Sequence, residues 1–348
     1  MDFGGGQEIR FERRGRAGVV TMTRPKALKA VTHDMVLALS RALEAWANDD
    51  SGALVASTGE GRAFCAGGDI LKVYEAGKAG RPLVEFFADE YRLNAAIARF
   101  PKPYVALVDG IVMGGGVGVS VHGSHRVFTE NAVFAMPEVG IGFFPDVGGS
   151  YFLPRLAGSF GAYLALTGNR IRRGDALWSG IATHAAPSSD IPALLDVLCE
   201  TGDAEAACAR FAVDAPRETS DAAISTIGRH FSLERLEDIV TSLGHAADQG
   251  DEMARDALAT IRTRSPTSLF VTLRQILHGS MLDIDECMRM EFRILNRMLA
   301  GHDFYEGIRA VLIEKGSTPA WRPARIEDVA PEEIEDYFAP LANGELEV

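Results

Sequence analysis

The chain has 348 residues, of which 47% are hydrophobic and 24% are charged. This length allows one large domain or two ordinary ones, and the composition is typical of a globular protein with a sizeable core. The formal net charge of −13 argues against a general nucleic-acid-binding protein, although it leaves room for a local basic patch that binds a phosphorylated ligand.

The four cysteines show no pattern of a redox or metal site. Cys65, Cys199, Cys208 and Cys287 form no CxxC pair, and no nearby histidine completes the spacing of a zinc site. Residues 1–18 are polar and glycine-rich, without the apolar segment of a secretory signal, and no apolar run has the length of a membrane span. We therefore expect a cytoplasmic protein with free thiols, no metal, and no membrane or nucleic-acid partner.

Strands and helices alternate in the first half of the chain. Residues 17–25 and 51–58 are rich in β-branched residues and predict buried strands. Helical periodicity follows over 26–50 and again over 83–99. A strand, a glycine-rich turn and a small-residue helix are then expected over 102–127. This half is therefore predicted to be α/β.

The character of the chain changes at about residue 190, where strand signals fade. Residues 265–280 predict a helix that begins at a Ser-Pro step, and residues 283–301 predict a longer helix ending at a glycine. The change in composition divides the chain into a core of residues 1–190, expected to carry the site, and a mainly helical region of residues 191–348.

Two glycine-bearing turns are candidates for chemistry: FCAGGDI at 64–70 and MGGGVG at 113–118. Glycine lets a ligand approach the backbone, and the start of a helix leaves N–H groups free. Two such turns could direct two N–H groups at one oxygen, which is an oxyanion hole. Each turn alone could equally serve geometry, and neither matches a Walker loop or a dinucleotide-binding fingerprint.

Two carboxylates, Glu138 and Asp146, lie in the otherwise apolar segment AMPEVGIGFFPDVGGSYFLP. Burying an ionised carboxylate is costly unless the group is paired or its pKa moves. Without further context, Glu138 could cap a turn and Asp146 could be a helix N-cap. The segment therefore predicts either two caps or a pair of catalytic carboxyls.

Several segments in order and spacing resemble the crotonase (enoyl-CoA hydratase/isomerase) superfamily, and its 3-hydroxyisobutyryl-CoA hydrolase branch most closely. The resemblance runs from about residue 8 to 330 and rests on RPKALKAV, AFCAGGDI, DEYRLN, KPYVALVDGIVMGGGVGVSVHG, FAMPEVGIGFFPDVGGSYFLPRL, ALTGNRI, MEFRI and GHDFYEGIRAVLIEK. It implies a spiral of ββα units followed by a helical C-terminal region. It also implies an acyl-CoA substrate, no separate cofactor because coenzyme A is part of that substrate, and compatibility with a homo-oligomer.

The resemblance also implies roles for individual residues. The backbone N–H groups of Ala66 and Gly115 would hold the thioester oxygen. Glu138 matches a catalytic glutamate of the superfamily, and Asp146 matches an aspartate typical of the hydrolase branch. Gly118 stands where hydratases carry a second glutamate, so two-glutamate water addition would lack half of its acid/base pair.

Further residues would bind the substrate. Glu90 matches an acidic substrate-site residue, although on a helix it could instead pair with Arg92. Substrate contacts are thus implied for Glu90, Gly115, Glu138 and Asp146. The resemblance places coenzyme A at Lys26, Ala27, Leu28, Gly68 and Asp69, while Lys29 replaces the more usual asparagine and Lys26 could equally be a solvated surface residue.

The predicted activity is hydrolysis of 3-hydroxyisobutyryl-CoA, a step of valine breakdown. Glu138 would attack the thioester carbon or act as general base on water, and Asp146 would hold the 3-hydroxyl group. One alternative is an enoyl-CoA hydratase or isomerase that uses Glu138 alone, and another is a non-catalytic acyl-CoA-binding protein. His122, His125 and Cys65 are interpreted as structural, because no paired base and orienting group accompany them.

Overall fold

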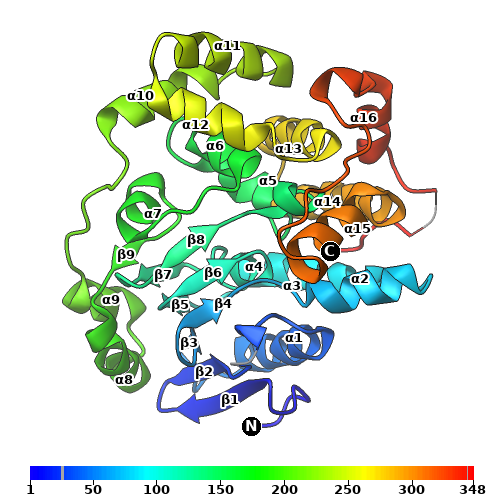
Figure 1. Cartoon of the computed structure of the whole chain (residues 1–348). Helices are drawn as coiled ribbons and strands as arrows, with labels where there is room; N and C mark the ends of the chain where they lie inside the picture. The colour runs from blue at the N-terminus through cyan, green and yellow to red at the C-terminus, as the bar shows by residue number, and fades with distance from the viewer. Residues whose placement is uncertain (25–26, 343) are drawn as a thin grey trace. The chain divides into compact units, whose positions relative to one another are not determined.

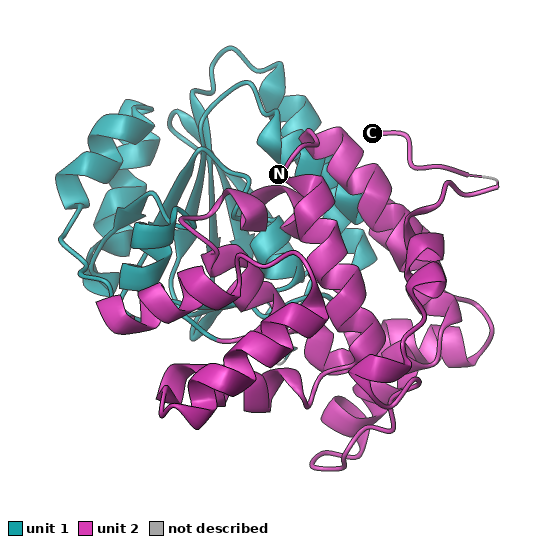
Figure 2. Cartoon of the chain, turned by 90° about the horizontal axis from the view of Figure 1, so that it is seen from above, with its two compact units in different colours: residues 1–69, 89–135, 170–218 teal, residues 70–88, 136–169, 219–348 magenta. Residues whose placement is uncertain are grey.

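A computed structural model describes residues 1–24, 27–342 and 344–348, which form two compact units interleaved along the sequence (Figure 2). The division differs from a single boundary near residue 190, because two internal segments leave the first unit and pack with the C-terminal helices. Unit 1 comprises residues 1–69, 89–135 and 170–218; unit 2 comprises residues 70–88, 136–169 and 219–348.

Among its described residues, unit 1 contains a six-stranded sheet and a three-stranded sheet (Figure 1). Only the first pair of the larger sheet, β1 with β2, is antiparallel. Its strands, in spatial order, are β1 (Ile9–Arg14), β2 (Ala17–Met22), β3 (Leu54–Gly59), β5 (Tyr104–Val108), β7 (His125–Phe128) and β9 (His184–Ala185). The parallel smaller sheet consists of β4 (Ala63–Cys65), β6 (Ile111–Met113) and β8 (Val133–Ala135).

Helices of unit 1 cover both faces of the larger sheet. The helical elements of unit 1 are α1 (His33–Ala47), most of α3 (Val84–Ala98), α4 (Gly115–Gly118), α7 (Arg173–Ser179), η4 (Ser188–Asp190), α8 (Ile191–Thr201) and α9 (Ala204–Phe211). On one face, Val19 and Leu54 join a buried apolar cluster with Leu194 and Leu198 of α8. Because both faces of the sheet are covered, every residue of β2 and β5 is buried.

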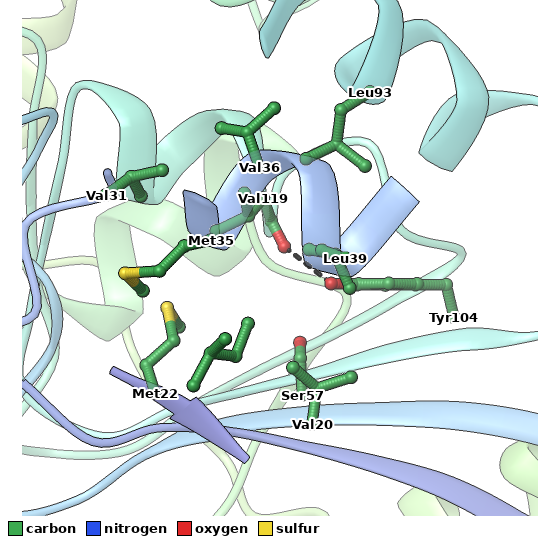
Figure 3. Close-up of a pocket in the computed structure, with 11 residues that line it drawn as sticks. Val20, Met22, Val31, Met35, Val36, Leu39, Ser57, Leu93, Tyr104 and Val119 are labelled. Carbon is green, nitrogen blue, oxygen red and sulfur yellow. Dashed lines mark hydrogen bonds between the residues drawn. The ribbon is translucent and has the colours of Figure 1, made fainter. Parts of the chain in front are cut away.

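The opposite face of the sheet packs against α1. Figure 3 shows Val20 and Met22 of β2 facing Met35 and Leu39 of α1, around a cavity of about 10 Å³. The Tyr104 hydroxyl donates a hydrogen bond to the Val119 carbonyl, 3.0 Å away, at its edge. A space of this size holds one water molecule at most, so this region is core and not a ligand site.

Unit 2 is mainly helical, as the sequence predicted for the C-terminal half. Its described elements are α2 (Ile70–Lys78), η2 (Glu138–Ile141), α5 (Gly149–Phe152), η3 (Leu153–Arg155), α6 (Phe160–Thr167), α10 (Asp221–His230), α11 (Leu236–Asp248), α12 (Glu252–Ile261), α13 (Pro266–Gly279), α14 (Ile284–Ala300), α15 (Asp303–Ile308), η5 (Arg309–Ile313), η6 (Ile326–Asp328) and α16 (Pro331–Phe338). Among the described residues, no helix combines the length and apolar character needed to cross a bilayer.

Local sequence explains where the helices begin. Ser265 caps α13 through a hydrogen bond from the Ser268 N–H, and Pro266 occupies the first turn. Asp283 and Glu286 form a capping box at the start of α14. The helix expected over 26–50 begins later, at His33, because the Thr32 side chain accepts from the Met35 N–H and caps it there.

Candidate active site

The two glycine turns lie together in unit 1. Strands β4 and β6 pair in parallel, so the turns that follow them meet at one edge of the small sheet. A Cβ atom built on Gly115 would lie 3.3 Å from the Gly68 nitrogen, and one built on Gly116 would overlap the Cys65 carbonyl. Glycine is therefore required for α4 to begin this close to the end of β4.

One predicted oxyanion donor is not available. The Ala66 N–H donates to the Leu28 carbonyl at 3.0 Å, within a set of bonds that joins the turn to the segment after β2. By contrast, the described residues provide no acceptor for the N–H of Gly68 or of Gly115. The assignment of Ala66 is therefore corrected: its N–H is engaged, and the N–H groups of Gly68 and Gly115, two neighbouring glycines, are the candidates in its place.

Glu90 lies directly beside this pair of glycines. It comes from α3 and is buried, and a Cβ atom on Gly115 would lie 2.6 Å from its Oε1. The Cys65 thiol lies close by. Its burial is the main cause that raises its pKa to about 12, and the charge of Glu90 adds to this rise. Since the thiolate is the nucleophile, Cys65 is unreactive at neutral pH, as its structural interpretation requires.

The segment predicted to bind coenzyme A forms a strained turn. Leu28 and Lys29 have φ values of 48° and 57°, in the left-handed region that non-glycine residues rarely adopt. Ala27 lies in the same turn, where its carbonyl accepts from the Ala30 N–H at 2.9 Å. Asp69 pairs with the Arg24 guanidinium at 2.8 Å. Lys26 lies outside the described residues.

The two predicted carboxyls come together in unit 2. Glu138 begins η2 after Pro137 and is buried, and its Oε2 has no hydrogen-bond partner among the described residues. Burial raises the pKa of the Glu138 carboxyl well above its ordinary value, and the charges of Asp146 and Glu291 raise it further. Asp146 is buried as well. The two carboxyls are therefore a buried, desolvated pair and not surface caps.

Two further side chains of unit 2, which sequence reasoning missed, hold the chain around Asp146. Glu291 of α14 accepts hydrogen bonds from the N–H groups of Gly148 and Ser150, and Gln275 of α13 donates to the Pro145 carbonyl. Their sequence signal is a polar residue on the buried face of an amphipathic helix, as in MEFRI. Such a pattern predicts burial but not the partner.

Within the described ranges, no three His, Cys, Asp or Glu side chains are arranged to hold a metal ion. His125 bonds Ser124 at 2.9 Å and Glu205 at 3.2 Å, and stacks on His184. These contacts give His125 a structural role on β7.

The family follows from fold, site and comparison together. Residues 17–338 match the family model described as enoyl-CoA hydratase/isomerase. The chain belongs to this family, whose fold is the predicted mixed α/β architecture with a helical C-terminal part.

Relatives and solved structures of the family match nearly the whole chain. It is 42% identical to the mitochondrial 3-hydroxyisobutyryl-CoA hydrolase of Gallus gallus, over 98% of this chain and 91% of the relative. The corresponding protein of Rattus norvegicus is 44% identical, over 97% and 90%. A structure titled as a carnitinyl-CoA dehydratase from Mycobacterium thermoresistibile matches with a TM-score of 0.92 and 41% identity, over 98% of this chain and 99% of that chain. One titled as an enoyl-CoA hydratase from Rhodobacter sphaeroides matches with a TM-score of 0.88 and 36% identity, over 98% and 100%.

Proposed function

We propose that this protein hydrolyses 3-hydroxyisobutyryl-CoA to 3-hydroxyisobutyrate and free coenzyme A. The observation that carries the proposal is the buried pair Glu138 and Asp146, combined with Gly118 at the position where a hydratase would need its second glutamate. Relatives at 42% and 44% identity that are named 3-hydroxyisobutyryl-CoA hydrolase support the same reaction.

In this proposal the carboxyl pair performs the chemistry. The ionised form of Glu138 attacks the thioester carbon, or removes a proton from the attacking water. The C–S bond breaks, the water oxygen ends in the new carboxylate, and the sulfur leaves as the coenzyme A thiol. Asp146 binds the 3-hydroxyl group. Burial raises the pKa of Glu138 well above its ordinary value, and the charge of Asp146 adds to this rise, which suits Glu138 to proton transfer.

Backbone N–H groups are proposed to stabilise the thioester oxygen in the transition state. The donors in this proposal are the N–H groups of Gly68 and Gly115, which replace the earlier pair that included Ala66. Removing one such donor typically lowers the rate 10²–10³-fold. Glu90, buried beside Gly115, would contact the acyl group. Ala27, Leu28, Gly68 and Asp69, with Lys26, are proposed to contact the coenzyme A moiety.

The acyl group places the reaction within breakdown of a branched carbon skeleton, and we propose valine catabolism as its setting. Relatives of the chain are named mitochondrial, and its cytoplasmic location stays a prediction, as does assembly into a homo-oligomer. No cofactor beyond the substrate's own coenzyme A is proposed.

The experiment is a thiol-release assay with purified protein and 3-hydroxyisobutyryl-CoA, in which a thiol reagent follows free coenzyme A. We expect multiple turnovers for the wild type and loss of nearly all activity for Glu138→Gln. Absence of thiol release by a folded wild-type protein would contradict the proposal. Thiol release that survives in Glu138→Gln would remove this residue from the mechanism.

A further inference from the structure

The turn that bears Asp146 has an unfavourable backbone conformation. Val147 has a φ of 51° and Gly148 a φ of 88°, so two consecutive residues are left-handed. For a β-branched residue such as Val147 this conformation is rare, because its side chain crowds the backbone. Strain of this kind persists only where surrounding contacts over-determine the conformation.

Contacts from α14 fix the turn on the side that follows Asp146. The Gly148 N–H donates to Glu291 Oε2 at 2.9 Å, and the Ser150 N–H donates to Glu291 Oε1 at 3.0 Å. The Ser150 hydroxyl also bonds Oε1. The left-handed turn prevents these two backbone N–H groups from bonding within a helix or strand. The fully buried carboxyl of Glu291 therefore provides acceptors for both.

Contacts from α13 fix the side that precedes Asp146. The Gln275 Nε2 donates to the Pro145 carbonyl, whereas Gln275 Oε1 is buried without a hydrogen-bond partner among the described residues. Among the described residues, the side chain thus contributes to this turn through its donor. Gly279, at the end of the same helix, lies so close to the Ser150 carbonyl that a Cβ atom there would overlap it.

We propose that Glu291 and Gln275 are positioning residues that clamp residues 145–150 from both sides and thereby hold the Asp146 carboxyl in its productive place. The inference rests on the proposed function in so far as Asp146 is taken to bind the 3-hydroxyl group of the substrate. The clamp itself is a property of the fold of unit 2.

The clamp makes recognition of the hydroxyl group sensitive to two residues outside the catalytic pair. A displacement of about 1 Å in a positioned group can cost about 10²-fold in rate. Loosening the turn should therefore penalise a substrate whose hydroxyl Asp146 binds, and should affect isobutyryl-CoA, which lacks that hydroxyl, much less. The ratio of kcat/KM for the two substrates reports this effect independently of the fraction of protein that is folded.

The variants follow from the contacts. Glu291→Gln keeps the shape, but its amide NH₂ group cannot accept from a backbone N–H, so one of the two bonds is lost. Gln275→Met keeps the length and removes only the donor to Pro145, so it tests the clamp should Glu291→Gln fold poorly. Ile294→Val, which removes a buried methylene from α14 and none of the hydrogen bonds of the clamp, is the matched control.

Two readouts are needed. In hydrogen exchange, we expect the amides of residues 146–150 to exchange at least tenfold faster in either clamp variant, with the amides of α6 unchanged. In the assay, we expect the 3-hydroxyisobutyryl-CoA to isobutyryl-CoA ratio of kcat/KM to fall about tenfold in both variants and to stay constant in Ile294→Val.

An unchanged substrate ratio would overturn the positioning role. The clamp would be overturned if exchange of the amides of residues 146–150 were unaltered, or if exchange rose equally throughout unit 2. The exchange measurement needs no substrate and therefore decides on the clamp even if the wild type released no coenzyme A. That last result would contradict the proposed hydrolase activity and not the clamp.

Discussion

Glu291 makes the stability of the protein depend on pH in a way that one substitution removes. Burial is the main cause that raises the pKa of its carboxyl from 4.5 to about 8, and the charge of Asp146 adds to the effect. Because the folded-state pKa lies above the unfolded one, ionisation favours unfolding. The stabilising contribution is fully present below pH 4.5 and is lost as the pH rises to about 8.

The magnitude follows from the size of this rise. At about 1.4 kcal/mol per pH unit, the full loss is about 5 kcal/mol, of which about 4 kcal/mol falls between pH 5 and pH 9. Glu291→Gln abolishes this pH-dependent loss of stability, because glutamine does not ionise. It also leaves a backbone N–H of Gly148 or Ser150 without its acceptor, which lowers the free energy of unfolding by about 1–3 kcal/mol. The variant is therefore expected to be less stable than the wild type at pH 5 and more stable at pH 9.

The measurement is urea-induced unfolding of both proteins at the two pH values, followed by circular dichroism. The Glu291 charge also raises the pKa of Glu138 and of Cys287, so the difference between variant and wild type reports the Glu291 carboxyl together with its coupling to these two groups. Ile294→Val, the control, should lower the free energy of unfolding by about 0.5–1.5 kcal/mol equally at both pH values. A deficit of Glu291→Gln that is the same at pH 5 and pH 9 would refute the reasoning.

Three further predictions concern the site. Glu138→Gln should lose activity without losing thermal stability, because a neutral amide replaces a buried carboxyl whose Oε2 has no partner among the described residues; a large fall in Tm would contradict this. Gly115→Ala should lower kcat about 10²–10³-fold, because the added methyl group would lie 2.6 Å from Glu90 Oε1. Gly228→Ala is the control and should remain active, because a methyl group at Gly228 would enter open space. Equal activities of the two variants would contradict this prediction. Asp146→Asn should move the acid limb of the residual kcat/KM profile to lower pH, because it removes a charge that raises the pKa of Glu138; an unmoved limb would count against the coupling.

The elements with strong local signals were predictable from the sequence. Helices α13 and α14 begin within one residue of the expected positions, because Ser265 with Pro266 and Asp283 with Glu286 are complete capping signals. The helix expected from residue 26 begins at His33, since the apolar periodicity does not reveal that Thr32 caps it. Capping residues therefore predicted the first residue of a helix more accurately than apolar periodicity did.

The oxyanion donors show what a motif leaves open. The sequence AGGD presents several neighbouring N–H groups, and their local pattern does not say which are free. That choice depends on how the turn pairs with residues 28–31: the Ala66 N–H donates to the Leu28 carbonyl, and the bridge between Val31 and Gly68 uses the Asp69 N–H and leaves the Gly68 N–H open. A long-range pairing therefore decided a detail that no window of sequence contains.

The support for Asp146 was also beyond the sequence. Glu291 follows Asp146 by 145 positions, and Gln275 follows it by 129 positions. Both carry the signal of a polar residue on an apolar helix face, which predicts burial without naming a partner. The interleaved units add to the difficulty, because residues 136–169 pack with helices that come much later in the chain.

The most direct test of hydrolase against hydratase chemistry is a competition in one vessel. Purified protein is incubated with equal amounts of 3-hydroxyisobutyryl-CoA and crotonyl-CoA, and all acyl-CoA species are followed by mass spectrometry. With Gly118 in place of a second glutamate, we predict that 3-hydroxyisobutyrate and free coenzyme A accumulate while crotonyl-CoA persists. Conversion of crotonyl-CoA to 3-hydroxybutyryl-CoA, with 3-hydroxyisobutyryl-CoA left intact, would contradict the account.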